Sequence, residues 1–242
     1  MAERILITGA NRGLGLEFVR QCAARGDTVL AACRTPSKAE PLLAFQQAHV
    51  GNVHVLALDV ADAASVNNVW DATGKLIDGL DVLINVAGVN SMSDHSADPS
   101  VHLSLGQLDA DAMLGMFRVN AIGPLMLAQR FLPLLKAGRN ARIANVSSWL
   151  GSLTVKTGGG NYSYCASKTA LNMLTRALAF DVQPMGIVAL ALNPGWVKTD
   201  MGGSHAALTP EQSVQGMLQV IDHAQTTDAG RFLEWNGKEH PW

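Results

Sequence analysis

Short apolar runs alternate with amphipathic helical stretches from one end of the chain to the other. The runs with strand character are Arg4–Thr8, Thr28–Cys33, Val53–Leu58, Val82–Asn85, Arg142–Val146, Ile187–Leu192 and Arg231–Glu234. The helical stretches between them are Leu14–Arg25, Pro41–His49, Ala63–Ile77, Ala110–Lys136, Ser163–Phe180 and Pro210–Ala224. Alternation of this kind predicts βαβ units. We therefore expect an α/β protein with a doubly wound, mostly parallel seven-stranded sheet and helices on both faces.

The same pattern indicates a single domain over residues 1–242, because it contains no internal repeat and no low-complexity linker. Three irregular stretches stand out, at Val89–Gln107, Trp149–Asn161 and Gly202–Thr209. In an open parallel sheet the loops beyond the carboxyl ends of the strands line the ligand crevice. We expect these stretches to surround a substrate.

Composition narrows the classes of function. Hydrophobic residues make up 48% of the 242 residues, and 18 Lys and Arg against 20 Asp and Glu give a net charge of −2 without a basic run. Nucleic acid and membrane surfaces are therefore not the expected partners. No stretch resembles a signal peptide or a membrane span. Three cysteines without paired spacing and seven scattered histidines favour a cytoplasmic protein without a metal site.

A glycine-rich turn joins the first strand to the first helical stretch, with the sequence Thr8-Gly9-Ala10-Asn11-Arg12-Gly13-Leu14-Gly15. Glycine lets the backbone turn tightly and approach a pyrophosphate, whose charge is favoured at a helix N-terminus. An ordinary glycine-rich turn is the alternative, but the strand before it and the helix after it favour a nucleotide. The expected cofactor-binding residues are Gly9, Asn11, Arg12, Gly13, Leu14 and Gly15.

The end of the second strand indicates which dinucleotide binds. NAD sites commonly place an acid there to bind the ribose 2′-hydroxyl, whereas this strand ends Ala31-Ala32-Cys33-Arg34. Arg12 and Arg34 would bring two guanidiniums to this corner, which suits a 2′-phosphate. Two solvated arginines on loops are the alternative. The pattern favours NADPH over NADH.

Asp59 and Val60 close the third strand and are further candidates for the cofactor site. The carboxylate of Asp59 has two open roles. It would accept the adenine amino group, or it would cap the helix that follows.

A phenol and an ammonium, Tyr164 and Lys168, stand four residues apart where a helical pattern begins. Positions i and i+4 lie on one helix face. A lysine beside a tyrosine favours the phenolate, so we expect a lowered Tyr164 pKa and easier proton transfer. Chance placement of an ordinary phenol is the alternative. The glycine loop and the Ser147-Ser148 strand end make a catalytic role the stronger interpretation.

These motifs occur in the order typical of one family, and the chain resembles the short-chain dehydrogenases/reductases over nearly its whole length. The marks are the Thr8–Gly15 loop, Asp59, Asn85-Val86-Ala87-Gly88, Asn120, Ser147-Ser148, Tyr164-x-x-x-Lys168 and Asn193–Asp200. The stretch Pro194–Gly203 and the end Gly237–Trp242 look most like the C-factor and sniffer branch, which is close to the carbonyl reductases. The resemblance implies a single Rossmann-fold domain.

The resemblance also implies roles for individual residues. The catalytic tetrad would be Asn120, Ser148, Tyr164 and Lys168. Ser148 is preferred to Ser147 because the family uses the second serine, and because neighbouring strand residues point to opposite faces. The implied cofactor contacts are Asn85, Ala87 and Gly88 at the adenosine ribose, Tyr164 and Lys168 at the nicotinamide, and Pro194, Gly195, Val197 and Thr199 at its carboxamide.

The implied reaction is the NADPH-dependent reduction of an aldehyde, ketone or quinone, with Tyr164 as proton donor, Ser148 on the carbonyl oxygen, Lys168 on the ribose and Asn120 orienting a water. A cofactor-binding signalling protein with little turnover is the alternative. The family's helices often pair across a two-fold axis, so a homodimer or homotetramer is expected through the helices at Ala110–Lys136 and after Tyr164.

Two departures from the family pattern affect these expectations. Val86 stands where relatives often have Asn, which should loosen a local hydrogen-bond network. The segment between Ser148 and Tyr164 is longer than in many relatives and carries Gly158-Gly159-Gly160. We expect this looser loop at the substrate mouth. Trp149, Trp196 and Trp242 either bound an apolar substrate pocket or pack in the core or at an interface.

Overall fold

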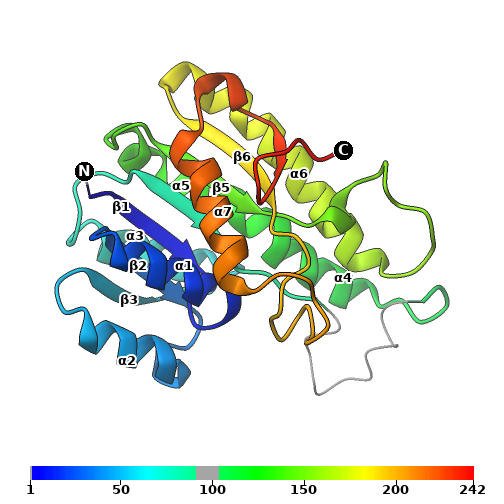
Figure 1. Cartoon of the computed structure of the whole chain (residues 1–242), viewed down its shortest axis with the longest axis horizontal. Coiled ribbons are helices and arrows are strands. Elements are labelled where there is room, and N and C mark those ends of the chain that lie inside the picture. Colours follow the sequence, from blue (N-terminus) through cyan, green and yellow to red (C-terminus); the bar gives the residue numbers. More distant parts are fainter. Residues whose placement is uncertain (1, 91–103) are drawn as a thin grey trace.

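The computed structural model describes residues 2–90 and 104–242. Seven strands form one sheet with the order β3-β2-β1-β4-β5-β6-β7, and every neighbouring pair is parallel. The strands are β1 (Arg4–Thr8), β2 (Thr28–Cys33), β3 (Val53–Ala57), β4 (Val82–Asn85), β5 (Arg142–Val146), β6 (Val188–Asn193) and β7 (Phe232–Glu234). The predicted doubly wound parallel sheet is confirmed (Figure 1).

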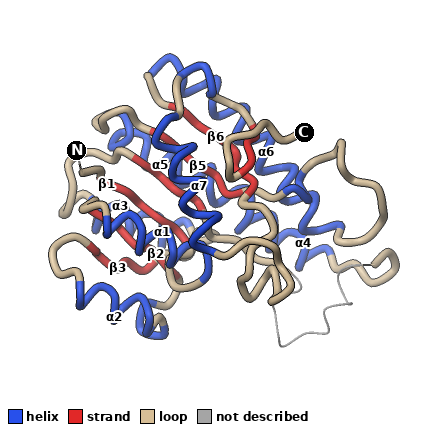
Figure 2. Tube along the Cα trace, in the orientation of Figure 1, coloured by secondary structure: helices blue, strands red, loops and turns tan. Residues whose placement is uncertain are grey.

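Helices connect the strands and cover both faces of the sheet, as Figures 1 and 2 show. The α-helices are α1 (Gly13–Ala24), α2 (Glu40–Ala48), α3 (Ala63–Thr73), α4 (Ala110–Phe117), α5 (Gly123–Lys136), α6 (Tyr162–Val182) and α7 (Pro210–His223). Short helical turns are η1 (Pro36–Lys38), η3 (Arg118–Ile122), η4 (Trp149–Gly151), η5 (Gln183–Met185) and η6 (Thr226–Asp228). Among the described residues, no helix is both long and apolar enough to cross a membrane.

Alternation along the strands divides the core into two layers. Ile5 and Ile7 of β1 pack on one face of the sheet, with Phe18 of α1, whereas Leu6 packs on the other face with Phe131 of α5. All are buried. A strand points successive side chains to opposite faces, so an uninterrupted apolar run supplies both layers at once.

The long helix expected over Ala110–Lys136 is interrupted. A π-helical turn, η3, separates α4 from α5 and contains the buried Asn120. Pro124 follows within the first turn of α5. Proline has no N–H, so the bond that residue 124 would donate to the carbonyl of Asn120 in an α-helix is absent. The extra residue of a π turn accommodates the missing bond and is frequent at functional sites.

The sheet order positions the site. After β3 the chain crosses back to β4 on the opposite side of β1, which makes the gap between β1 and β4 the switch point of the topology. Ligands of open parallel sheets bind at such a point, beyond the carboxyl ends of the strands. The segments that follow β1, β4 and β5 all emerge at this edge.

Candidate active site

A cavity of about 410 Å³ opens at the switch point. Most of the residues predicted to bind cofactor line it, namely Gly9, Asn11, Arg12, Gly13, Leu14, Gly15, Arg34, Asp59, Val60, Ala87, Gly88, Tyr164, Lys168, Pro194 and Thr199. Three predicted residues, Asn85, Gly195 and Val197, do not lie on its wall, and neither do Asn120 and Ser148.

The glycine loop forms a cradle that only glycine permits. Gly9 has φ +66°, and a Cβ built on it would lie 2.9 Å from the backbone of Ala87. A Cβ on Gly15 would lie 2.1 Å from the carbonyl oxygen of Gly9. Arg12 is the N-cap residue of α1, and its side chain makes no capping hydrogen bond with the first N–H groups of that helix. An uncapped helix start behind a bare backbone fits a pyrophosphate.

Thr8 fixes the segment after β4 against this loop. Its hydroxyl oxygen accepts hydrogen bonds from the backbone N–H groups of Val86 and Ala87, each at 3.1 Å. The segment is therefore held although Val86 has no amide side chain. Asn85 does not face the cavity as expected. Its Nδ2 donates to Oδ1 of Asn145 at 2.8 Å inside the sheet, because its strand position points it into the core.

The adenosine end of the cavity carries three cations, Arg12, Arg34 and Lys38. Arg12 is not free: its Nη1 lies 2.9 Å from Oδ2 of Asp200, and both side chains are largely exposed. Lys38 was not predicted from the sequence. It lies at the end of η1, the turn that follows Arg34, and it also lines the cavity. Pro36 was the available signal, since proline at the start of a short turn fixes its direction.

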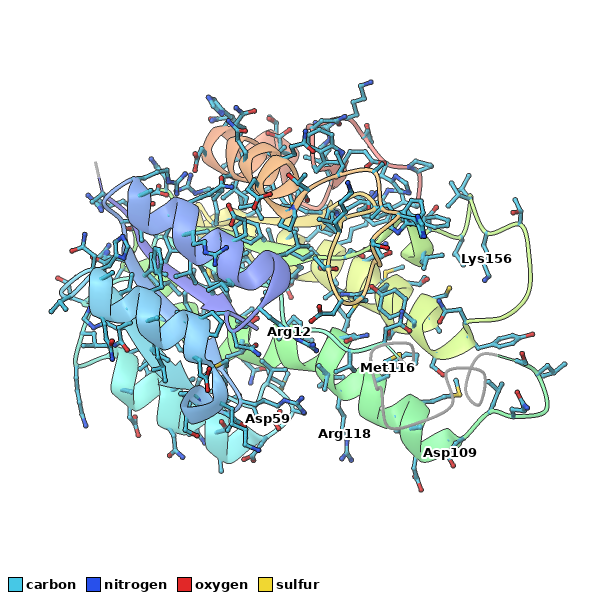
Figure 3. The ribbon with its side chains drawn as sticks, turned by 60° about the horizontal axis from the view of Figure 1, so that its bottom comes forward. Arg12, Asp59, Asp109, Met116, Arg118 and Lys156 are labelled. Atoms are coloured by element: carbon cyan, nitrogen blue, oxygen red, sulfur yellow. The ribbon has the colours of Figure 1, made fainter. Side chains whose placement is uncertain are left out.

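Asp59 lies on the cavity wall and does not cap a helix. Asp62 caps α3 instead, with its carboxylate accepting from the N–H groups of Ala64 and Ser65. Asp59 accepts from the N–H of Ala61 at 2.9 Å. The capping alternative for Asp59 is therefore wrong. Figure 3 shows Arg12 and Asp59 on the same side of the molecule, with Lys156 on the loop at the opposite end.

Tyr164 and Lys168 meet at the other end of the cavity. Both lie on α6 and are buried, and the Lys168 Nζ lies 5.9 Å from the centroid of the Tyr164 ring. Nζ donates to the carbonyl oxygen of Val146 at 2.8 Å. Burial lowers the pKa of Lys168 to about 8. Burial also raises the pKa of Tyr164 to about 12, against the opposing effect of a hydrogen bond with Ser148.

The expected lowering of the Tyr164 pKa is therefore wrong for this structure. Lys168 sits over the ring, 5.9 Å from its centroid, and burial is the largest cause of the raised pKa of Tyr164. Consequently Tyr164 holds its proton at neutral pH and is suited to donate it.

The two serines at the end of β5 face different partners. Ser147 donates to Oδ1 of Asn172 at 2.6 Å and is thereby turned into the core. The Oγ of Ser148 accepts from the N–H of Leu150 at 3.2 Å, and Ser148 lowers the pKa of Tyr164 by hydrogen bonding. Ser147 lines the cavity and Ser148 does not, so the choice of Ser148 stays a prediction. The Tyr164 hydroxyl also lies 3.9 Å from the sulfur of Met201, which the sequence analysis did not single out.

Asn120 acts on the backbone around the site. Its Oδ1 accepts from the N–H of Val89 at 2.8 Å, and its Nδ2 donates to the carbonyl oxygen of Val89 and to Oγ of Ser167. A Cβ on Gly88 would lie 3.4 Å from the Asn120 side chain and 3.6 Å from the Lys168 Nζ. Asn120 and Lys168 thus both approach the same point beside Gly88.

The segment after β6 closes the end of the cavity at Tyr164. Pro194 and Thr199 line the cavity, and Oγ of Ser213 donates to the carbonyl oxygen of Pro194 at 2.7 Å. Gly195 adopts φ +77° and packs against Leu208.

Two of the tryptophans considered for a substrate pocket, Trp149 and Trp196, are exposed, so core packing is wrong for them, whereas a pocket or an interface stays open. Of the three expected substrate segments, most of Val89–Gln107 lies outside the described residues.

Comparisons with known proteins agree with this geometry. Residues 3–208 match the family described as short chain dehydrogenase. The chain is 43% identical over 171 residues to the C-signal protein of Myxococcus xanthus, covering 71% of this chain and 98% of that protein. The structure is similar to NADPH-bound carbonyl reductase from chicken fatty liver, with TM-score 0.88, 35% identity and coverage of 100% and 99%. It is also similar to the carbonyl reductase Sniffer of D. melanogaster, with TM-score 0.89, 34% identity and full coverage of both chains.

Proposed function

Because the chain belongs to the short-chain dehydrogenase family and is an NAD(P)-dependent oxidoreductase, we propose that it reduces the carbonyl group of a small molecule with NADPH, with Tyr164 as the proton donor. The observation that carries the proposal is the buried pair of Tyr164 and Lys168 on one helix, at the wall of the cavity that the glycine loop also lines. The substrate would be an aldehyde, ketone or quinone.

The adenosine end supports NADPH. Arg34 and Lys38 line the cavity and form no ion pair within the described part of the chain, so both are available to a 2′-phosphate. Arg12 would join them by exchanging Asp200 for the phosphate. Guanidinium groups bind phosphate through paired hydrogen bonds, so a ligand without the phosphate would gain less at this corner.

The bound cofactor would supply the hydride for the carbonyl carbon. Tyr164 would donate its proton to the carbonyl oxygen as charge develops there. Ser148 would donate a second hydrogen bond to the same oxygen and stabilise its charge in the transition state. Met201, now against the Tyr164 hydroxyl, would have to make room for the substrate. One hydride and one proton convert the carbonyl to an alcohol.

Lys168 and Asn120 would restore the proton. After donation Tyr164 carries a negative charge, which the nearby ammonium of Lys168 stabilises. The carbonyl of Asn120 lacks its helical donor because of Pro124, and the side chains of Asn120 and Lys168 both approach Gly88. A water on that carbonyl would link Lys168 to solvent and return the proton.

The test is a screen of aldehydes, ketones and quinones for carbonyl-dependent oxidation of NADPH, with parallel fluorescence titrations of NADPH and NADH. We expect turnover with at least one carbonyl class, and tighter binding of NADPH than of NADH. Absence of turnover across the panel by a protein that binds NADPH would contradict the reductase function. Equal affinities, or tighter NADH, would contradict the cofactor preference.

A signalling role is the second candidate, and the similarity to a protein named C-signal is what favours it. Such a role would require cofactor binding without turnover. The same screen therefore separates the two candidates, since a signalling protein would bind NADPH and leave every carbonyl unreduced.

We also propose that residues 1–242 form one domain that pairs with a second copy through α5 and α6. Met173 and Phe180 on α6 are 66% and 62% exposed, which is unusual for large apolar side chains on one helix. The free cysteines Cys22, Cys33 and Cys165 fit a reducing compartment such as the cytoplasm. Light scattering of the purified protein would give the oligomeric state.

A further inference from the structure

A chain of polar side chains leads from the end of the molecule to the catalytic serine. It begins at His240, passes through Glu234 at the end of β7, and reaches Asn193 at the end of β6. Asn193 and Glu234 are paired neighbours in the sheet register, so their side chains start from adjacent positions at the same edge. None of these three side chains lines the cofactor cavity.

Asn193 holds two catalytic segments with one oxygen. Its Oδ1 accepts from the N–H of Trp149 at 3.0 Å and from the N–H of Gly195 at 3.2 Å. Trp149 directly follows Ser148, and Gly195 directly follows Pro194 at the cavity wall. The same amide oxygen therefore sets the distance between the serine peptide and the segment after β6.

Glu234 determines which way the Asn193 amide points. Asn193 Nδ2 donates to Oε2 of Glu234 at 2.8 Å. A carboxylate accepts and never donates when ionised, so it fixes the amide nitrogen on its own side and the amide oxygen toward the two backbone N–H groups. Hydrogen bonds to an ionised acceptor are stronger than neutral ones.

The C-terminal tail in turn holds Glu234. His240 Nδ1 donates to Oε1 of Glu234, and the His240 ring lies edge-on against Phe232, with centroids 4.7 Å apart. Two residues after His240, the carbonyl oxygen of Trp242 accepts from the backbone N–H of Thr154, which lies on the segment between Ser148 and Tyr164. Figure 1 shows the chain end beside α6.

We propose that Glu234 is a positioning residue for the reaction: through Asn193 it fixes the peptide after Ser148 relative to the Pro194–Gly195 segment, and His240 holds it in place. The proposal rests on the proposed function. Without Glu234, the Asn193 amide is free to rotate, the two N–H groups lose their shared acceptor, and Ser148 shifts relative to the bound cofactor. Displacement of a reacting group by about 1 Å lowers turnover on the order of a hundred-fold, so a partial shift lowers it less.

The test is a double-mutant cycle of Glu234→Ala and Asn193→Ala, read as kcat for NADPH-dependent carbonyl reduction. We expect Glu234→Ala to lower kcat on the order of ten-fold and Asn193→Ala to lower it at least as much. Because Glu234 acts through Asn193, the double variant should be no slower than Asn193→Ala alone. Losses that multiply, or an unchanged kcat in Glu234→Ala, would overturn the proposal.

Two further variants separate positioning from general stability. Glu234→Gln keeps one oxygen that can accept from Asn193 Nδ2 but loses the second acceptor, so it should retain more turnover than Glu234→Ala. Glu239→Ala removes an acid from the same tail, whose one ion pair within the described part of the chain is with the half-buried Arg231, and should match the wild type. Equal losses in Glu234→Gln and Glu234→Ala would overturn the proposal, and so would a loss in Glu239→Ala.

A readout that needs no turnover distinguishes this proposal from the reductase function. In protein labelled with ¹⁵N-tryptophan, the backbone amide of Trp149 should exchange with solvent faster in Glu234→Ala, whereas the amide of Trp70 in α3 should not change. If Trp149 exchanges faster in Glu234→Ala but the wild-type protein reduces no carbonyl, the contact from Glu234 through Asn193 to Trp149 is supported and only the reductase function is contradicted. Unchanged exchange at Trp149 would overturn the positioning role.

Discussion

The two ends of the cavity use charge in opposite environments. At the adenosine end, the Arg12 side chain is 58% exposed and shares its charge with Asp200 and water. At the proton-transfer end, Tyr164 and Lys168 are 7% and 4% exposed, and burial moves the pKa of each. The attraction between exposed cations and a phosphate is weak and is screened by salt. Burial, in contrast, shifts the pKa of an ionisable group directly. In the proposed function, one end would select the cofactor and the other would perform proton transfer.

The largest effect should come from removing the hydroxyl at the buried end. Tyr164→Phe keeps the buried ring and loses the proton donor, so kcat should fall on the order of a thousand-fold, within the range typical of general acids. NADPH affinity should stay within about two-fold, because the phosphate contacts lie at the other end. Steady-state rates and fluorescence titrations measure the two quantities.

Tyr162→Phe is the matched control, since the chain has only two tyrosines and Tyr162 lies one position before Ser163 on the same helix. This variant should turn over at the wild-type rate. Comparable losses in the two variants would contradict the assignment of Tyr164.

At the exposed end, removal of two cations should change affinity and leave chemistry alone. The variant Arg12→Ala/Arg34→Ala should bind NADPH on the order of 10- to 100-fold more weakly, because each guanidinium provides charged hydrogen bonds to phosphate. NADH affinity should change by no more than about two-fold. Added salt should weaken NADPH binding more in the wild type than in the variant.

Arg20→Ala provides the control at this end, because Arg20 lies on α1 and pairs with Glu17 away from the cavity. Its NADPH affinity should equal that of the wild type. The account of the exposed end fails if the double variant loses NADPH and NADH affinity equally, or if its kcat at saturating NADPH falls.

The smallest expected effect is on the free energy of unfolding, and it concerns the buried end, where the charge of Lys168 is destabilising. Burial lowers the pKa of Lys168 from 10.5 to about 8, so the unfolded chain binds more protons between these pH values and Lys168 costs stability below about pH 8. Lys168→Met should therefore raise the free energy of unfolding of the cofactor-free protein by roughly 2–3 kcal/mol at pH 7. Turnover should be lost in the same variant.

The gain should shrink as the pH rises through 8 and vanish near 10.5, where Lys168 is uncharged in both states. Denaturant melts of wild type and variant across this range measure the difference. A difference that does not depend on pH, or a less stable variant at pH 7, would show that burial of the charge is not the cause.

Local physics explains what the sequence could predict. The strands were predictable because apolar runs such as Arg4–Thr8 reflect a two-residue period and burial on both faces. The glycine cradle was predictable because the tight turn between β1 and α1 leaves no room for a Cβ at Gly9 or Gly15. Tyr164 and Lys168 could be paired from the sequence because their spacing on one helix does not depend on the rest of the fold, whereas Asn120 and Ser148 were named from the family resemblance.

The remaining features depend on contacts between distant segments. The pair of Arg12 with Asp200 joins residues 188 positions apart, which no local pattern reveals. The raised pKa of Tyr164 depends on burial under the segment that carries Met201. The inward direction of Asn85 depends on Asn145 in the neighbouring strand.

The central claim is that the protein transfers hydride from NADPH to a carbonyl carbon, and isotope transfer tests it most directly. Wild-type protein would be incubated with a carbonyl substrate from the panel and NADPH deuterated at the transferable position of the nicotinamide. The account predicts an alcohol that carries one deuterium on the former carbonyl carbon, as read by mass spectrometry. An alcohol without deuterium, or no alcohol from any carbonyl while NADPH binds, would contradict it.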